Sequence, residues 1–389
     1  MGTTLEISAP LAYREARSVL TFDEAKLLAT QRSTPLLVVS RSTLIRNYET
    51  LKENLPGVQF FYAVKANPDH LILTTLAELG CSADVCSYGE ARAALWAGFE
   101  PNEMIHTHPC KVVQNLVECY KAGIRWFTFD SQYELPKLAE FAPDANLLLR
   151  LAVSTSSSVI DLSAKFGAAP QDALMLIKRA GRMGLEVRGI SFHVGSQCLS
   201  PNDFNSALGQ VRRIWDRATK AGFSLEVLDI GGGIPAPYRS AVLTQEAYCQ
   251  QLAQALDRWF GDLSIRIIAE PGRCLCAEAV TLVTRVIGKS VRHGVNWYII
   301  DDGLYGSFSG KVYDHADFPL IAENDGDRPL KPCIVAGPTC DSTDVVARDQ
   351  NLPDLKIGEL LLVPTMGAYT SASASDFNGL DEARSVAID

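Results

Sequence analysis

The sequence of 389 residues predicts an α/β fold, a (β/α)8 TIM-like barrel, followed by a C-terminal all-β domain. Three observations predict it. Apolar runs alternate with amphipathic segments from about residue 60 to residue 271, and polar residues collect at the carboxyl ends of these runs. After Arg273 the helical periodicity gives way to β-rich runs. Active sites of such barrels lie at the carboxyl ends of the strands, so the polar residues there are the candidate site.

Before the barrel, residues 21–31 are expected to form a helix, and residues 36–39 a short strand. Eight apolar runs then follow, each an expected barrel strand. These runs are 60–65, 83–87, 104–108, 126–131, 147–153, 187–194, 225–231 and 265–271. A doubly wound sheet is the competing fold, but no G-x-G-x-x-G follows the first strand, as dinucleotide binding in that fold requires.

The amphipathic segments between the strands are expected to be helices. Clear examples are 89–97, 112–122, 170–183, 202–221 and 245–260. Several are followed by glycine, as at Gly98, Gly123 and Gly222, which is typical of a helix end. A helix after each strand is the pattern of the barrel.

The last part of the chain predicts β structure. Four β-rich runs, 280–286, 295–301, 333–337 and 359–364, are interrupted by a turn-rich interval, 322–332. We therefore expect a barrel over residues 39–275 and a β domain over residues 276–389. Residues 1–38 are expected to form an N-terminal segment that associates with the β domain.

Composition excludes several classes of function. Hydrophobic residues make up 47% of the chain and charged residues 21%, the formal net charge is -9, and no long basic run occurs. Nucleic acid and anionic membranes are therefore not expected as partners. No stretch approaches the roughly 20 apolar residues that cross a bilayer, and no secretory signal is recognised. Ten cysteines without paired spacing indicate reduced thiols and a cytoplasmic protein.

No metal site is predicted. The chain contains neither C-x-x-C nor H-E-x-x-H, which rules out the common structural and catalytic zinc patterns. His106 and His108 could share one face of a strand, but no third ligand is visible beside them.

Lys65 ends the first barrel strand, directly before Ala66, Asn67 and Pro68. A partly desolvated lysine loses its proton more easily and can attack a carbonyl carbon to form a Schiff base. Other strand ends carry complementary groups: Asp84, His106, His108, Asp130, Arg150, His193, Gly231, Gly232, Gly233 and Glu270. A solvated lysine at a strand end is the ordinary alternative. Only the complementary groups at the other strand ends favour a reactive lysine.

Two of these strand ends indicate a phosphate site. Gly231, Gly232 and Gly233 follow the seventh strand, where backbone N–H groups can approach an anion and where phosphate sites recur in barrels. Glu270 and Arg273 follow the eighth strand. A phosphate cradle, a carboxylate and a nucleophilic lysine fit pyridoxal 5'-phosphate, whose ring nitrogen is kept protonated by an acid.

The chain resembles the fold type III, alanine-racemase-like pyridoxal-phosphate enzymes, and within them the ornithine decarboxylase group. The matching stretches run in the family's order along nearly the whole chain. They are YAVK at 62–65, SFHVGS at 191–196, DIGGG at 229–233, EPGR at 270–273, DGLYGSF at 302–308, VYDH at 312–315, GPTCD at 337–341, and GAYT at 367–370 with FNG at 377–379.

The resemblance implies roles for the barrel residues. Lys65 is expected to be the Schiff-base lysine, His193 to stack on the pyridine ring, and Glu270 to pair with the ring nitrogen. The expected phosphate contacts are Ser196, Gly232, Gly233, Arg273 and Tyr369. Asp84, Glu90 and Arg150 are expected to support the lysine and the ring. The loop from Ser154 to Ser158, leading to Lys165, resembles a mobile loop that gates solvent.

The resemblance also assigns residues of the β domain. Cys340 is expected to deliver a proton to the α-carbon after carbon dioxide leaves. Cys340 and Asp341 are expected to reach the site of a partner subunit, which implies a head-to-tail homodimer with shared active sites. Asp314 and Asp341 are expected to bind the distal amine of the substrate, because an ammonium group taken out of water needs a charged partner. Tyr305 and Phe377 complete the expected substrate site.

The favoured reaction is decarboxylation of L-ornithine to putrescine and carbon dioxide, a step of polyamine biosynthesis. L-lysine, or a substituted diamino acid of a specialised pathway such as siderophore assembly, is the alternative, because one methylene contributes only about 1–3 kcal/mol of discrimination. A decarboxylase-like binding protein without turnover is an alternative of another class. Racemases of the superfamily differ by carrying a catalytic tyrosine in place of Cys340 and Asp341.

Overall fold

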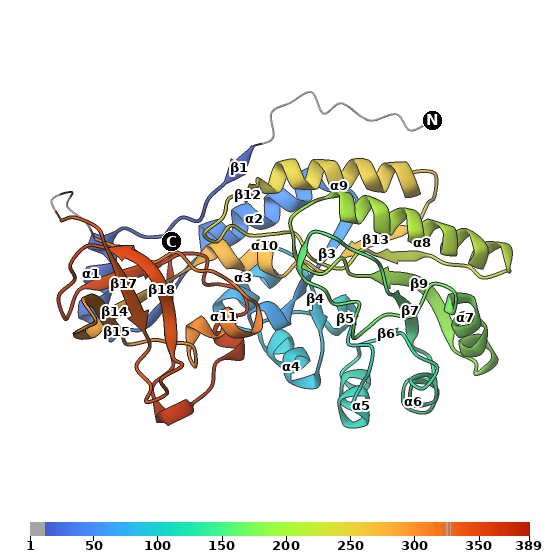
Figure 1. The fold of residues 1–389 in the computed structure, drawn as a ribbon. Coiled ribbons are helices and arrows are strands. Elements are labelled where there is room, and N and C mark those ends of the chain that lie inside the picture. Colours follow the sequence, from blue (N-terminus) through green and yellow to red (C-terminus); the bar gives the residue numbers. More distant parts are fainter. Residues whose placement is uncertain (1–11, 324–325, 327) are drawn as a thin grey trace.

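The barrel is closed by parallel strands in the order β11-β13-β3-β4-β5-β6-β7-β9. The structure, a computed structural model, describes residues 12–323, 326 and 328–389 (Figure 1). The barrel strands are β3 (Val58–Ala63), β4 (Ser82–Val85), β5 (Met104–His106), β6 (Trp126–Phe129), β7 (Asn146–Leu151), β9 (Glu186–Phe192), β11 (Val227–Asp229) and β13 (Arg266–Ala269). Each overlaps an expected strand, so the predicted fold class is confirmed.

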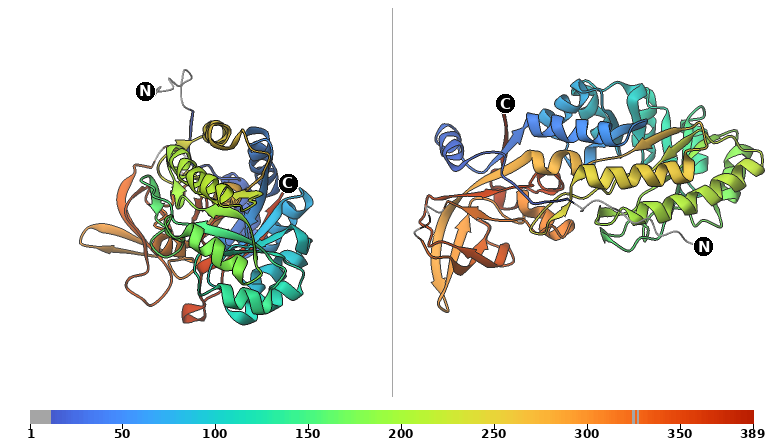
Figure 2. Two further views of the ribbon diagram at one scale, coloured as in Figure 1. Left: turned by 90° about the vertical axis from the view of Figure 1, so that its right-hand side faces the viewer. Right: turned by 90° about the horizontal axis from the view of Figure 1, so that it is seen from above.

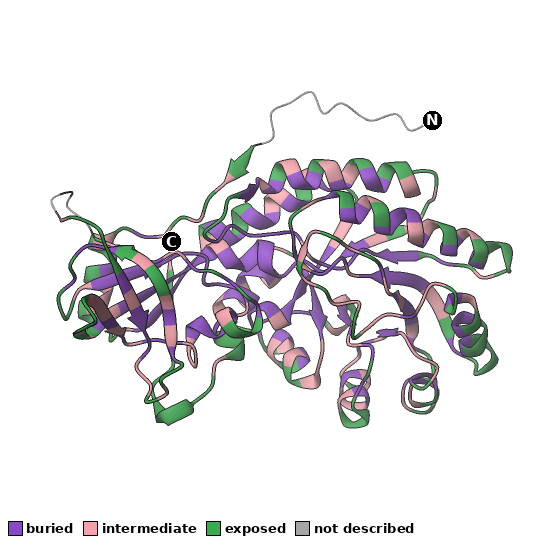
Figure 3. Ribbon diagram, in the orientation of Figure 1, coloured by how far each residue is buried: buried purple, intermediate pink, exposed green. Residues whose placement is uncertain are grey.

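Helices cover the outside of the barrel. They are α3 (His70–Glu78), α4 (Tyr88–Trp96), α5 (Val113–Lys121), α6 (Leu135–Phe141), α7 (Ala173–Arg182), α8 (Asn202–Lys220) and α9 (Gln245–Phe260). Each lies between two barrel strands in the sequence and connects them on the outer face. Figure 3 shows the expected result: burial is concentrated on the strands and on the helix faces turned toward them.

The eighth position of the helical ring is filled in a way that the sequence pattern did not predict. After β13 comes only α10 (Arg273–Cys276), because the chain leaves for the β domain. Helix α2 (Arg41–Asn54), which precedes the first barrel strand, packs between α9 and α3 instead. Asn47 of α2 fixes this arrangement, since its Nδ2 donates to the carbonyl of Leu275 at 2.9 Å while its own carbonyl accepts from Gln245 at 3.0 Å.

The centre of the barrel is filled by side chains. Inward-facing residues from five strands form one buried apolar cluster: Phe61, Ile105, Leu148, Val227 and Ile268. Burying a side chain of this size contributes about 1.5–3 kcal/mol. The packed interior leaves the rim at the carboxyl ends of the strands as the place for polar groups.

The β domain is a second, mostly β layer beside the barrel, at the left in Figure 1 and in the right view of Figure 2. Its strand order is β16-β19-β14-β15-β17-β18. These strands are β14 (Val280–Arg292), β15 (Val295–Ile300), β16 (Ile321–Ala322), β17 (Lys331–Ala336), β18 (Val345–Leu352) and β19 (Leu360–Val363). The turn-rich interval expected at 322–332 includes residues 324, 325 and 327, which lie outside the described residues.

A strand from before the barrel completes this sheet. Strand β2 (Leu36–Ser40) pairs antiparallel with β14 and parallel with β20 (Arg384–Ile388). Helix α1 (Phe22–Gln31) begins with a capping box between Thr21 and Glu24 and packs against β19. The first eleven residues of the expected N-terminal segment lie outside the described residues.

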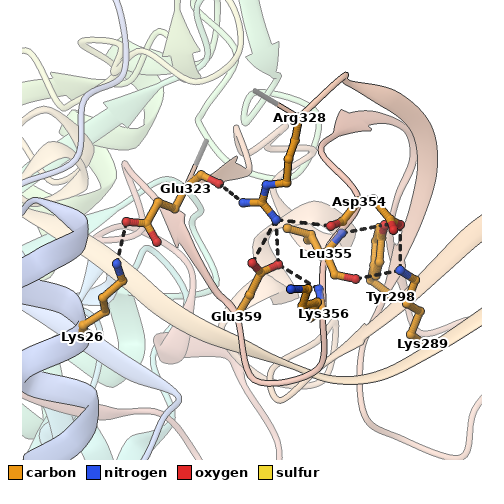
Figure 4. A network of polar contacts seen from close by, with 9 residues as sticks. All are labelled: Lys26, Lys289, Tyr298, Glu323, Arg328, Asp354, Leu355, Lys356 and Glu359. Carbon is orange, nitrogen blue, oxygen red and sulfur yellow. Dashed lines mark hydrogen bonds and ion pairs between the residues drawn. The ribbon is translucent and has the colours of Figure 1, made fainter. Parts of the chain in front are cut away.

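Polar contacts tie α1 to the outer end of the β domain (Figure 4). Lys26 Nζ lies 2.5 Å from Glu323 Oε1, Arg328 Nη1 lies 2.9 Å from Glu359 Oε1, and Lys289 Nζ lies 2.7 Å from Asp354 Oδ1. These side chains are largely accessible to solvent, where one ion pair contributes about 0–1 kcal/mol. The network therefore orients this edge more than it stabilises it.

Small elements complete the described chain. They are β1 (Tyr13–Arg14) with β12 (Val242–Leu243), β8 (Ser158–Ile160) with β10 (Ser196–Cys198), α11 (Gly310–Tyr313), and the 3-10 turns η1 (Val64–Ala66), η2 (Pro101–Glu103), η3 (Ala277–Ala279), η4 (Ser307–Ser309), η5 (Ser371–Ser373) and η6 (Phe377–Gly379). None of the described helices combines the length and apolar character needed to cross a membrane.

Candidate active site

Lys65 lies at the carboxyl end of β3, in the turn η1, and forms an ion pair with Asp84. The distance from Lys65 Nζ to Asp84 Oδ2 is 2.5 Å. Asp84, from β4, is fully buried and also accepts a hydrogen bond from the hydroxyl of Thr107, directly after β5. Three neighbouring strand ends therefore converge on one amine. The Lys65 side chain keeps 33% of its surface exposed, so a small molecule can reach it.

The charges around Lys65 reverse the effect that burial has on it. Burial alone would lower the pKa of Lys65, but the carboxylate of Asp84, followed by the weaker influence of Cys86 and Glu270, raises that pKa well above its ordinary value. The expectation that desolvation eases proton loss is therefore wrong for this arrangement. The amine must first pass a proton to another group before it can act as a nucleophile.

Two carboxyl groups share the interior of the barrel mouth. Glu270 follows β13, and burial, the charge of Asp229 and the charge of Asp84 raise its pKa well above the ordinary range. Burial likewise raises the pKa of Asp229 to about 6. Two carboxyl groups held close together in a buried place do not readily ionise at the same time. The pair therefore holds a proton near neutral pH.

His193 is a neutral imidazole beside these acids. Its Nδ1 accepts a hydrogen bond from the backbone N–H of Gly195 at 2.9 Å, which places the ring proton on Nε2. Burial, with the charges of Arg150 and Lys65, lowers the pKa of His193 well below its ordinary value. A neutral ring can lie against another flat ring without a charge to desolvate.

The glycines after β11 form a cradle with no space for side chains. Gly231 and Gly233 have φ values of +66° and +124°, in the left-handed region that favours glycine. A Cβ on Gly232 would lie 2.5 Å from the carbonyl oxygen of Glu270, and one on Gly233 would lie 2.6 Å from that of Gly195. The backbone is thus brought close to the neighbouring strand ends, as an anion site requires.

Arg273, the first residue of α10, lies buried next to this cradle. Its Nη2 donates to Ser196 Oγ at 2.6 Å, and its Nη1 donates to the Tyr238 hydroxyl at 2.5 Å. The guanidinium lies over the ring of Tyr369, 4.8 Å from its centre. It also pairs with both carboxylate oxygens of Asp314, at 2.6 and 2.7 Å. Arg273, an expected phosphate contact, and Asp314, an expected substrate contact, therefore form an ion pair with each other.

The remaining barrel candidates surround this group. Glu90, in α4, accepts the backbone N–H of Cys86 at 2.7 Å, and burial raises the pKa of Glu90. Arg150, in β7, lies over the ring of Phe166, at 5.6 Å. Phe166 lies in the segment to which the expected gating loop, Ser154 to Ser158, leads. That segment is fixed at its end, because the N–H of Gly167 donates to Asp130 at 2.8 Å.

A second cluster lies on the surface of the β domain. The Tyr305 hydroxyl donates to Asp341 Oδ2 at 2.5 Å, and the rings of Tyr305 and Phe377 stack with centres 4.3 Å apart. Cys340 is exposed, and its backbone N–H donates to Asn378 Oδ1 at 3.0 Å. Among the described residues, no hydrogen bond or ion pair connects this surface cluster to Lys65 or Glu270. One chain thus presents two separate sets of site residues.

A buried aspartate that sequence reasoning missed organises the surface cluster. Asp344 is 2% exposed and accepts hydrogen bonds from the N–H groups of Leu304, at 2.8 Å, and Thr339, at 3.2 Å. It thereby fixes the two loops that carry Tyr305 and Cys340. Its position three residues after Asp341 was the available signal, because aspartate in a turn commonly binds nearby backbone.

Three further missed residues contact predicted ones. They are Thr107, Asp229 and Tyr238. Asp229 ends a strand just before the glycines, which is a usable signal, whereas Tyr238 lies in a loop with no pattern around it. His106 and His108 do not share one environment: the ring of His106 stacks on Phe127, while that of His108 meets Phe166 edge-on.

Comparison with known proteins adds independent information. Residues 41–277 match the family described as pyridoxal-dependent decarboxylase, pyridoxal binding domain. The lysine/ornithine decarboxylase of Selenomonas ruminantium is 43% identical over 357 residues, which cover 92% of this chain and 90% of that protein. The antizyme inhibitor 2 of Xenopus laevis is 36% identical over 360 residues, covering 89% of this chain and 79% of that protein.

A solved structure gives the same result at the level of the fold. The crystal structure of lysine/ornithine decarboxylase from Vibrio vulnificus, complexed with putrescine, superposes with a TM-score of 0.89 at 37% identity. The superposition covers 95% of this chain and 99% of that one.

Proposed function

This chain belongs to the pyridoxal-dependent decarboxylases, which confirms the resemblance recognised in its sequence, and we propose that it decarboxylates a basic amino acid. The proposed reaction converts L-ornithine to putrescine and carbon dioxide, with L-lysine as the alternative substrate. The observation that carries the proposal is the convergence of Lys65, Asp84, His193, Glu270 and Arg273 at one end of the barrel. The names of the relatives and of the putrescine complex support the substrate class.

The residues present fit pyridoxal phosphate. The glycine cradle has no room for a Cβ, and next to it lie the Arg273 guanidinium and the Ser196 hydroxyl, a donor set suited to a phosphate group. The carboxyl pair of Glu270 and Asp229 suits a protonated ring nitrogen. When bound, pyridoxal phosphate supplies an electron-withdrawing ring that accepts the electron pair released as the carboxyl group leaves.

Lys65 and Glu270 would hold the cofactor at two different places, the aldehyde carbon and the ring nitrogen. Lys65 would bind the aldehyde carbon through Nζ, and Asp84 or solvent would take the proton that the amine must first lose. Glu270 and Asp229 share a proton, and Glu270 would face the ring nitrogen as its carboxylate partner once that proton has passed to the nitrogen. His193 offers a neutral flat ring to the face of the cofactor, held in place by Gly195.

Two carboxylates are proposed to select the substrate. A distal ammonium group brought out of water needs a charged acceptor, and Asp314 and Asp341 are the candidates. Hydrogen bonds from Tyr305 and Thr343 lower the pKa of Asp341, so its side chain is anionic. The Tyr305 hydroxyl holds that carboxylate, and the stacked rings of Tyr305 and Phe377 would offer an aromatic surface to the methylene chain.

The active unit is proposed to be a homodimer. Cys340 is exposed and Asp341 half-buried on the β domain, whereas Lys65 lies at the barrel mouth, and within one chain no hydrogen bond or ion pair joins these sets in the described part. A second copy that brings Cys340 to the barrel mouth would complete each site. There the Cys340 thiol would supply a proton to the α-carbon, which commits the reaction to the amine product.

Two further proposals concern the division into domains and the cellular compartment. Division into a segment at 1–38, a barrel at 39–275 and a β domain at 276–389 is supported by the family match at 41–277. A cytoplasmic location is supported by the cysteines, all of which lie in the described part and are free.

A second candidate function is a decarboxylase-like protein without turnover. One observation favours it: a relative 36% identical is named as an inhibitor and not as a decarboxylase. Retention of Lys65, His193, Glu270 and Cys340 in this chain favours the enzyme.

The test is release of carbon dioxide from L-ornithine, L-lysine, L-arginine and diaminopimelate by protein loaded with pyridoxal phosphate. We expect release from ornithine, with a smaller kcat/KM for lysine, because the two differ by one methylene. Release from lysine alone would reverse the order of substrates. No release from any of the four would overturn the proposed function and leave the binding protein.

A further inference from the structure

The buried ion pair of Arg273 and Asp314 joins two residues with different proposed tasks. Arg273 is a proposed phosphate ligand, and Asp314 is a proposed ligand of the substrate's distal ammonium. Their side chains bind each other through two parallel contacts of 2.6 and 2.7 Å. The residues are only 5% and 8% exposed, so solvent compensates neither charge well.

Almost all N–H groups of the Arg273 guanidinium already have an acceptor. The two Nη atoms carry four N–H bonds. Asp314 takes two of these, Ser196 takes one and Tyr238 takes one. The remaining donor, Nε, is buried without a partner. A phosphate that binds through Nη must therefore displace an acceptor that is already there.

Charge decides which acceptor is displaced. Ser196 and Tyr238 are neutral, and their hydroxyl groups can turn to donate to a phosphate. Asp314 is an anion, so a phosphate on the same guanidinium repels it at close range. Asp314 and Arg273 both line a cavity of about 210 Å³, together with Tyr238 and His315.

We propose that the cofactor's phosphate and the substrate's distal ammonium exchange partners with this ion pair, so that each ligand strengthens the binding of the other. The proposal rests on the proposed function, in which Arg273 binds phosphate and Asp314 binds the amine. A phosphate alone leaves the buried Asp314 without its cationic partner, and an ammonium alone leaves the buried Arg273 without its anionic partner. The two ligands together satisfy both charges.

Thermodynamic linkage makes the effect reciprocal. A diamine that lowers the dissociation constant of a phosphate ligand is itself bound more tightly, by the same factor, in the presence of that ligand. Coupling between two such sites is typically about 5- to 150-fold. Asp314 is on this account a positioning residue for the phosphate as well as a substrate ligand, because it sets the strength of the Arg273 contact.

The test measures binding and needs no turnover. Pyridoxine 5'-phosphate is the probe, because it has the ring and the phosphate but no aldehyde, and so cannot bond to Lys65 or to an amine. Its dissociation constant is measured calorimetrically on the full chain, with and without putrescine or cadaverine. We expect the diamine to lower the dissociation constant at least about fivefold.

Two variants separate the exchange from general electrostatics. In Asp314→Asn, pyridoxine phosphate is expected to bind more tightly without diamine, and the diamine effect is expected to disappear. Asp262→Asn is the matched control. It removes the same charge from another two-contact ion pair, in which Asp262 contacts Arg212 at 2.6 and 2.8 Å, outside the lining of this cavity. Asp262→Asn is expected to behave as the wild type.

The outcomes are distinguishable. If the diamine does not change the dissociation constant of pyridoxine phosphate in the wild type, the exchange is overturned. The proposed function then stays in place. An undiminished diamine effect in Asp314→Asn overturns the exchange too, because direct attraction between phosphate and ammonium then explains the coupling. Carbon dioxide release from ornithine tests the proposed function separately, on the same preparation.

Discussion

At Lys65 the neighbouring acidic groups, Asp84 first among them, together outweigh the effect of burial on the pKa. Asp84 accepts from the amine at 2.5 Å and raises its pKa, so Lys65 is held in place as a cation. The same barrel mouth keeps His193 neutral and gives Glu270 a proton. Burial is the main cause of the pKa shifts of His193 and Glu270, whereas at Lys65 the neighbouring charges reverse its effect.

Cys340→Ala tests the proton donor at the residue scale. Without the thiol, the proton is expected to reach a cofactor carbon instead of the α-carbon, so the amine yield falls and the aldehyde and pyridoxamine phosphate appear. Product analysis by mass spectrometry measures the ratio of amine to aldehyde. Cys110→Ala is the control, because Cys110 is also exposed and free but lies outside the candidate site. An unchanged amine yield in Cys340→Ala would remove Cys340 from the proposed role.

The sequence predicted the site residues at strand ends better than the contacts between them. Lys65, Asp84 and Glu270 follow from the barrel pattern, because equivalent strand ends converge. The pairing of Arg273 with Asp314 did not follow. The two are 41 residues apart in different structural layers, and the sequence pattern indicated a different ligand for each. Long-range charge pairing depends on how the β domain packs on the barrel, which no local pattern reports.

At the scale of elements, predictions failed where a pattern was weak. Strand β18 was not predicted, because it lies at the edge of its sheet and carries exposed charged residues such as Arg348 and Asp349. Strand β20 is only five residues long. Helix α2 was not among the expected helices, and its place as the eighth ring helix was therefore missed as well. The central barrel strands, by contrast, are continuous apolar runs and were predicted.

Gly232→Ala tests the cradle between β11 and β13. The added Cβ would lie 2.5 Å from the Glu270 carbonyl oxygen, so the two strand ends must separate. We expect a loss of about 1–3 kcal/mol in the free energy of unfolding, as for other overpacked sites, together with weaker cofactor binding. Urea unfolding and cofactor titration measure the two effects.

A second glycine provides the control for this substitution. A Cβ added to Gly181, in α7, would have no other atom within 4 Å, so Gly181→Ala meets no neighbour. It is expected to stabilise the helix by up to about 1 kcal/mol, because alanine is the better helix former. Equal behaviour of the two variants would show that the cradle is not tightly packed.

At the scale of the whole molecule, the separation of Lys65 from Cys340 predicts complementation between subunits. Lys65→Ala and Cys340→Ala dimers are each expected to be nearly inactive in amine formation. Mixed and reassociated in equal amounts, they form mixed dimers with one intact site, so activity should recover to about a quarter of the wild type. The assay is amine formation after mixing, with each variant alone as the control. No recovery, in samples shown to contain mixed dimers, would place both residues in one chain's site.

The position of β2 has a consequence for how the chain is made. Val38 of β2 pairs with Thr281 of β14, so the entire barrel is encoded between two adjacent strands of one sheet. During synthesis, which proceeds from the N-terminus, β2 leaves the ribosome long before the strands that flank it exist. Until then its apolar residues have no sheet to join. A shortened gene that ends after the barrel would leave β2 permanently in that condition.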